Sequence, residues 1–154
     1  MKRLTTLTVA SVMALSSFSF AAFGESHAMK EEAMMYEMGE EGIEALMKAN
    51  GAATKVLGDM AKGTTAYDAT AAEEAKMALI ANAKEIPHVF EQPIEGGETL
   101  PAAWENWEDF VAKATAMEEA AMALDVSSAE SIGAGLGMVG GTCGGCHQLY
   151  RVKS

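Results

Sequence analysis

Hydrophobic side chains recur at three- and four-residue steps along most of the chain, which is the spacing of one face of an α-helix. The first such stretch extends from Met29 to Ala61. Lys62 and Gly63 follow it, a basic residue and a glycine of the kind that close helices. We therefore predict a helix over 29–61, and its apolar face carries Ile43, Leu46, Met47, Asn50, Thr54, Leu57 and Met60.

A second helix is predicted between Asp68 and Pro87. Thr70 and Glu73 have the spacing of a capping box at its start. Proline disfavours a helical conformation in the residue before it, so Pro87 should end the helix. The loop that follows, residues 87–101, carries all three prolines of the chain and a pair of glycines.

The last two helices are predicted after Pro101 and from Ser127, where Glu130 completes a second capping box. No segment shows the sustained two-residue alternation of a β-strand. Four amphipathic helices with mostly short connections predict an all-α protein, an antiparallel four-helix bundle. The apolar stripe of the third helix consists of Trp104, Trp107, Phe110, Val111, Ala114, Met117, Ala121 and Leu124, and that of the fourth of Ile132, Leu136, Val139, Cys143, Cys146 and Tyr150.

The N-terminus has the layout of a secretory signal peptide. Two basic residues precede a stretch without charges, and small residues follow at positions 22–28. A transmembrane anchor is the alternative, but the stretch is only about long enough to span a bilayer and is rich in serine and threonine. We predict a signal peptide over residues 1–28, cleaved after Gly24 or Ala28, and a bundle domain over residues 29–154 of an exported, periplasmic protein.

The chain is strongly acidic, with a formal net charge of −11. An acidic surface repels nucleic acids and anionic membranes, so neither is expected as a partner. Such a surface would suit a basic protein partner. The same charge would also serve simply to keep an exported protein soluble.

The stretch "GLGMVGGTCGGCHQLYR", residues 135–151, contains three chemical signatures. A G-x-G-x-x-G pattern occupies residues 135–140, a C-x-x-C pair occupies residues 143–146, and this pair with the following histidine spells a covalent haem-attachment site. Dinucleotide binding needs a strand before the glycines and a βαβ unit around them. Here a helical stripe precedes them and the chain ends soon after, which argues against that function.

Three chemical functions are then to be weighed for Cys143, Cys146 and His147. A thioredoxin-like dithiol would need a βαβ setting, which the pattern does not provide. Zinc needs three or four ligands, but the adjacent Cys146 and His147 point about 100° apart on a helix. In the third interpretation the two thiols bond the vinyl groups of one haem c, and His147 coordinates its iron. The cysteines lie on the apolar stripe of an exported chain, and this favours the haem.

Seven glycines cluster around the motif, although each costs a helix about 1 kcal/mol relative to alanine. A glycine allows close approach, either of a flat macrocycle or of a neighbouring helix. The sequence leaves both explanations open for Gly133, Gly135, Gly137, Gly140, Gly141, Gly144 and Gly145.

A four-helix bundle with C-x-x-C-H near its C-terminus resembles the class II c-type cytochromes, the cytochrome c prime family. The resemblance covers the whole chain after the signal peptide. Its most specific parts are "GGTCGGCHQLYR", "AWENWEDFVAKA" and "LMKANGAATKVLGDMAKGTTAYD". It implies that Cys143 and Cys146 carry the thioethers of one covalent haem c inside the bundle, and that His147 is the proximal iron ligand.

The resemblance also implies a role for Arg151, which matches a basic residue that family members place beside the proximal histidine. Arg151 follows His147 by four residues, one turn of a continuing helix. A basic residue near any helix C-terminus is an equally good explanation.

On the distal side, the family carries at the position of Met47 either an apolar residue that stays unbonded or a methionine that ligates the iron. Members with an unbonded position usually have an arginine four residues earlier, where this chain has Ile43. This departure favours ligation by Met47. The alternative is that Met47 only fills the core, as methionine commonly does.

By this resemblance the chain is a periplasmic electron carrier rather than an enzyme, with His147 and Met47 as axial ligands of one haem and a redox protein as partner. The alternative is a five-coordinate, high-spin haem that binds or handles nitric oxide or carbon monoxide. The family often pairs two subunits through the first two helices, so a homodimer is a further expectation.

Overall fold

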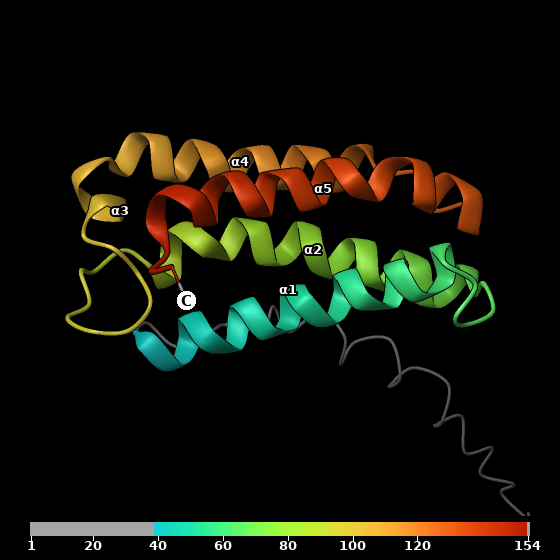
Figure 1. The fold of residues 1–154 in the computed structure, drawn as a ribbon, viewed down its shortest axis with the longest axis horizontal. Coiled ribbons are helices and arrows are strands. Elements are labelled where there is room, and N and C mark those ends of the chain that lie inside the picture. Colours follow the sequence, from blue (N-terminus) through green and yellow to red (C-terminus); the bar gives the residue numbers. More distant parts are fainter. Residues whose placement is uncertain (1–38, 154) are drawn as a thin grey trace, which may run out of the picture. The chain divides into compact units, whose positions relative to one another are not determined.

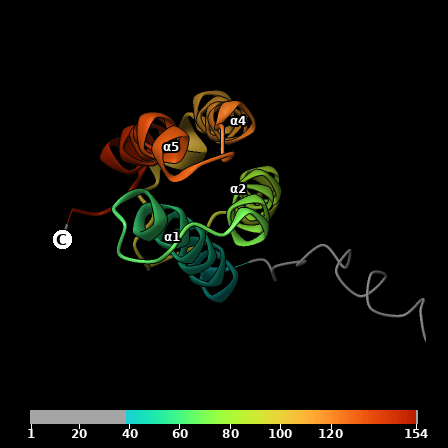
Figure 2. The same ribbon diagram turned by 90° about the vertical axis from the view of Figure 1, so that its right-hand side faces the viewer.

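A computed structural model of the chain describes residues 39–153. These residues form α1 (Glu40–Ala61), α2 (Ala69–Val89), α3 (Ala102–Glu105), α4 (Trp107–Ala123) and α5 (Ala129–Tyr150). The four long helices run antiparallel to their neighbours, and each contacts two others but not the diagonal one (Figures 1 and 2). The prediction of an all-α, antiparallel four-helix bundle is confirmed. Within the described residues, no helix is long and apolar enough to cross a membrane.

The apolar stripes predicted from the sequence meet along the axis of the bundle. Most of their residues form one continuous core or pack against it, and Cys143 and Cys146 are among its partly buried neighbours. Burial of large apolar side chains of this kind contributes about 1.5–3 kcal/mol each. The most deeply buried large side chains are Leu46, Leu57, Leu79, Val89, Leu124, Ile132 and Val139.

The first helix differs from the prediction at its start and agrees at its end. α1 begins at Glu40, because Gly39 has a φ of 111° that a helix does not allow. A helix continuous from residue 29 is therefore wrong, and residues 29–38, like the predicted signal peptide over residues 1–28, lie outside the described part. Gly63 closes the helix as predicted, in the left-handed conformation with a φ of 70°.

Two predictions for the second helix are corrected. Its N-cap is Asp68, whose carboxylate accepts a hydrogen bond from the backbone N–H of Ala71 at 2.8 Å, so the Thr70–Glu73 capping box is wrong. Pro87 does not end the helix, which continues to Val89. A proline in the last turn removes only one backbone donor.

The burial of Ile86 and Val89 against the core favours this extra half-turn. As a result His88 lies in the last turn of α2, exposed, rather than in a loop.

The third predicted helix is broken in two at Asn106, which has φ −121° and ψ 47°. Its side-chain amide donates to the carbonyl of Ala102 at 3.0 Å, and this local bond competes with helix continuation. The short α3 is fixed to the end of α2, because the Trp104 indole donates to the carbonyl of Phe90 at 2.8 Å.

The fourth helix begins one residue later than predicted and with a different capping partner. Ser128 is the N-cap, and Ser128 and Ser131 form a reciprocal capping box through two 3.0 Å hydrogen bonds. Ser127 as the start and Glu130 as the box partner are therefore wrong. The cap positions α5 so that its apolar stripe, including both cysteines, faces the core.

Candidate functional site

A cavity of about 800 Å³ lies in the half of the bundle that contains the C-terminal end of α5. Residues of α1, α2, α4, α5 and the loop before α3 border it. This volume falls within the range of about 300–1,000 Å³ that is common for ligand sites. The structure brings all five predicted site residues to this one cavity: Cys143, Cys146, His147, Arg151 and Met47.

The wall formed by α5 carries the three residues of the motif. Cys143 and Cys146 are partly buried, and neither is part of a disulfide. Burial raises the pKa of both thiols. Partial burial lowers the pKa of His147, the Arg151 guanidinium lowers it further, and the Glu98 carboxylate opposes this. The neutral imidazole, the form that binds metals, is therefore favoured.

The wall formed by α1 carries Met47 and, three residues later, Asn50. Met47 is half-buried and packs against the core, and Ile43 borders the cavity one turn before it. Asn50 is only 8% exposed, and its Oδ1 has no hydrogen-bond partner. The sequence marked Asn50 as a core position but gave no sign that this residue would border a cavity.

A second thioether borders the cavity from α4. Met117 is 5% exposed, and its place on the apolar stripe identified it from sequence only as a core residue. The periodicity of a helix distinguishes its inside from its outside, but not a core residue from a residue at a cavity wall.

Aromatic rings form the end of the cavity. The Phe110 ring lies 5.0 Å from that of Phe90 and 5.4 Å from that of Tyr150, between ring centroids. The Tyr150 hydroxyl donates to the Asp109 carboxylate. This bond raises the pKa of Tyr150 to about 12 and lowers the pKa of Asp109. Lys113, whose ammonium lies 3.5 Å from the same carboxylate, also borders the cavity.

The prediction placed Arg151 on the same helix as His147, one turn later, but Arg151 lies beyond the end of that helix. α5 ends at Tyr150, and Arg151 has extended dihedrals of φ −111° and ψ 140°. Its side chain is held by Glu98, which accepts from Nε at 2.8 Å. The backbone N–H of Val152 donates to the carbonyl of Glu98 at 2.8 Å, which fixes the same contact. Arg151 therefore reaches the cavity from the segment that pairs with the loop before α3.

The glycines of α5 have two different functions in the structure. A Cβ at Gly135 would lie 2.8 Å from Cδ1 of Leu124, so this glycine permits close helix packing. Gly140 borders the cavity, and a Cβ there would have no atom within 4 Å. This open space above the backbone is where a flat ligand would be able to approach.

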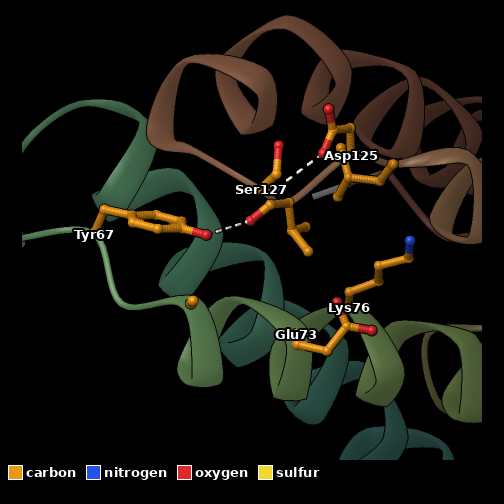
Figure 3. A pocket seen from close by; sticks show the side chains of 8 residues that line it. Tyr67, Glu73, Lys76, Asp125 and Ser127 are labelled. Carbon is orange, nitrogen blue, oxygen red and sulfur yellow. Dashed lines mark hydrogen bonds between the residues drawn. The ribbon is translucent and has the colours of Figure 1, made fainter.

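A smaller pocket of about 300 Å³ lies at the opposite end of the bundle (Figure 3). The Tyr67 hydroxyl crosses it and donates to the carbonyl of Val126 at 2.8 Å, which ties the α1–α2 loop to the α4–α5 connection. Its charged side chains are Glu73, Lys76 and Asp125, and it contains neither cysteine nor histidine. We interpret this pocket as a feature of the loop packing.

Comparison with known proteins decides the family. The sequence profile of the cytochrome c′ family matches residues 43–151. The chain belongs to the cytochrome c′ family. It is 40% identical over 113 residues to cytochrome c-556 of Agrobacterium tumefaciens (strain apple 185), covering 71% of this chain and 90% of that relative.

Two solved structures of the cytochrome c′ family have the same fold. Cytochrome c′ from Rhodobacter spheroides aligns with a TM-score of 0.66 and 31% identity, over 74% of this chain and 95% of that one. Cytochrome c556 from R. palustris aligns with a TM-score of 0.64 and 27% identity, over 72% of this chain and 93% of that one. The relatives of this cytochrome thus carry both names, c556 and c′.

Membership of a cytochrome c family implies a covalent haem c, and the cavity fits that group. It has two thiols three residues apart, the His147 imidazole beside them and open space over Gly140. Lys48, Lys113 and Arg151 on its border could pair with the haem carboxylates. Among residues 39–153, no group of three histidine, cysteine, aspartate or glutamate side chains gathers as a metal cluster, so the zinc interpretation has no support.

Proposed function

We propose that this cytochrome is a periplasmic electron carrier whose single haem is ligated by His147 and Met47. The observation that carries the proposal is that the Met47 side chain borders the same cavity as Cys143, Cys146 and His147. The neighbouring Ile43 supplies no cation to this side, unlike the arginine usual in members with an open iron. A thioether is a soft, neutral ligand suited to haem iron.

In this proposal the bound haem supplies the reversible one-electron chemistry. Cys143 and Cys146 hold it covalently, which prevents its loss to the solvent. His147 and Met47 would bind from two helices that pack against each other, α5 and α1, so that neither ligand has to move far when the electron is transferred. A thioether as second ligand raises the reduction potential relative to a second imidazole.

We further propose that the protein is exported, and that its redox partner is a basic protein. The signal-peptide layout of residues 1–28 supports export, and the net charge of −11 supports a basic partner. Mass spectrometry of the periplasmic fraction should find a chain that begins at Glu25 or Met29. An intact N-terminus in the membrane fraction would contradict export. A homodimer through α1 and α2 is part of the same proposal, and sedimentation analysis of the purified protein decides it.

Replacement of Met47 by leucine tests the ligation. The wild type should show sharp low-spin bands when reduced and a weak sulfur-to-iron band in the near infrared when oxidised. Met47→Leu should lose the near-infrared band and bind carbon monoxide. The matched control is Met117→Leu, which removes the other thioether at the cavity and should leave the spectra unchanged.

Three outcomes would contradict the proposal. Unchanged spectra in Met47→Leu would remove Met47 as a ligand, and loss of the near-infrared band in Met117→Leu would assign the ligand to α4. A wild type that is already high-spin and binds carbon monoxide would support the second candidate function, that of a five-coordinate gas-binding cytochrome. The similarity to relatives named cytochrome c′ is the observation that favours this second candidate.

A further inference from the structure

The loop before α3 pairs with the segment after α5 at the border of the cavity. Thr99 and Arg151 form an antiparallel bridge. A backbone hydrogen bond of 2.8 Å flanks this bridge on either side. The N–H of Val152 donates to the carbonyl of Glu98, and the N–H of Leu100 donates to the carbonyl of the last residue of α5. The backbone itself thus brings Glu98 and Arg151 together.

The side chains of Glu98 and Arg151 form an ion pair on this backbone frame. One carboxylate oxygen accepts from Nε of Arg151 at 2.8 Å and from a terminal guanidinium nitrogen at 2.5 Å. The loop is also held from α1, because Gly97 has a φ of 72° and a Cβ there would collide with the carboxylate of Glu40. An exposed ion pair adds little stability by itself, so the position of this pair is set by the backbone around it.

The ion pair lies next to His147. The backbone N–H of Arg151 donates to the carbonyl of His147 at 3.2 Å, and all three side chains border the cavity. Burial lowers the pKa of His147 most; the guanidinium of Arg151 lowers it further, and the Glu98 carboxylate opposes this. The two charges therefore act on the imidazole in opposite directions.

The other charged side chains at the cavity are differently placed. Lys48 pairs with Glu44 within α1, and Lys113 pairs with Asp109 within α4. Glu40 lies in the first turn of α1. Among residues 39–153, the cation that borders the cavity and directly follows the motif helix is therefore the one that Glu98 holds.

We propose that Glu98 is a positioning residue that holds the Arg151 guanidinium beside the proximal ligand, balances its charge and so sets the reduction potential of the haem. The inference rests on the proposed function in one respect, the ligation of the iron by His147. The oxidised iron carries one more positive charge than the reduced iron. A cation nearby therefore favours the reduced state, and a carboxylate nearby favours the oxidised state.

The experiment measures the reduction potential of the full chain with its covalent haem, at low salt because salt screens exposed charges. Glu98→Gln leaves the guanidinium without its counter-charge and should raise the potential. Arg151→Gln leaves the carboxylate alone and should lower it. Each change should be roughly two- to tenfold in the reduction equilibrium, or about 18–59 mV for one electron. An unchanged or lowered potential in Glu98→Gln would overturn the proposal.

The double variant Glu98→Gln/Arg151→Gln tests whether Glu98 positions Arg151 or only adds a charge of its own. Once Glu98→Gln has released the guanidinium, removing Arg151 should matter less. The potential of the double variant should therefore be higher than the sum of the two single shifts predicts. Shifts that simply add would mean that Arg151 keeps its place without Glu98, and would overturn its role as a positioning residue.

Glu118 provides the matched control. It pairs with Lys84 at 3.4 Å between α4 and α2, and neither residue borders the cavity. Glu118→Gln removes the same charge from a comparable ion pair and should leave the potential unchanged. A shift as large as that of Glu98→Gln would show that the loss of any surface carboxylate has this effect, and would contradict the inference.

The design separates this inference from the ligation by Met47. The near-infrared band reports Met47, and none of these variants should remove it. A wild type without the band contradicts ligation by Met47, but Glu98→Gln should still raise its potential, because the effect depends on His147. An unchanged potential in a Glu98→Gln protein that retains the band contradicts this inference alone.

Discussion

Replacing Gly135 by alanine should destabilise the bundle, although alanine is the better helix former. Gly135 lies in the second turn of α5, and a Cβ there would be 2.8 Å from Cδ1 of Leu124. This distance is about 1 Å shorter than a favourable contact between carbon atoms. Leu124 is only 1% exposed and belongs to the core, so turning its side chain aside would disturb its packing there.

The magnitude follows from two opposing terms. Overpacking a well-packed core costs about 1–3 kcal/mol. The higher helix propensity of alanine returns about 1 kcal/mol. The net loss for Gly135→Ala is therefore about 0–2 kcal/mol. At Gly137, where a Cβ would have no atom within 4 Å, only the favourable term applies, so Gly137→Ala should be more stable than wild type by about 1 kcal/mol.

The quantity to compare is the difference between the two variants, which isolates the contact with Leu124 at about 1–3 kcal/mol. Urea unfolding of the haem-loaded proteins, followed by far-ultraviolet circular dichroism, gives both free energies of unfolding. Equal stability of Gly135→Ala and Gly137→Ala would refute the reasoning, because it would mean that Leu124 moves aside without cost.

Gly140 extends the same test to the haem. A Cβ at this position has open space in the protein, but the position borders the cavity. If the macrocycle occupies that space, Gly140→Ala should not gain the stability that Gly137→Ala gains, and its haem bands should shift. A gain of about 1 kcal/mol with unchanged bands would place the macrocycle away from Gly140.

Two further predictions concern Tyr150 and Asp68, whose hydrogen bonds the sequence did not predict. Tyr150→Phe removes the bond to Asp109, so its loss of stability relative to wild type should be constant between about pH 4 and pH 10. The stability difference between the variant and wild type should shrink as pH rises from 10 toward the raised Tyr150 pKa of about 12. It should also shrink as pH falls below 3.8 through the lowered pKa of Asp109. A stability difference that grows in either range would contradict this prediction. Asp68→Ala should lower the free energy of unfolding by about 1 kcal/mol because it removes the N-cap of α2, whereas Thr70→Ala should change it little. Urea unfolding measures both, and the reverse order would favour the Thr70 capping box.

The helices could be predicted because the apolar spacing is a property of each segment alone. Their ends could not, because they depend on competing local bonds. Asp68 rather than Thr70 is the N-cap of α2. The Asn106 amide donates to the carbonyl of Ala102, and this bond interrupts a helix that the apolar stripe alone would have allowed to continue. Pro87 was tolerated because the buried Val89 beyond it favours the helix.

The residues of the candidate site likewise differ in whether the sequence alone could identify them. Cys143, Cys146 and His147 could be found because their spacing within one helical turn is itself the requirement for attaching a haem. Met47 needed the resemblance to a family, since its own pattern is that of a core methionine. Asn50 and Met117 could not be distinguished from other core residues, because their significance depends on which side chains from other helices fail to fill the space beside them.

The glycines of α5 show how the fold and the site constrain one another. A helix with glycine at so many positions is locally unfavourable, by about 1 kcal/mol for each relative to alanine. Such local conflicts often mark functional or tightly packed positions. Gly135 is required by Leu124 on the side of the core. At Gly140, which borders the cavity, a Cβ would meet no protein atom within 4 Å, and we expect the haem to require the glycine there.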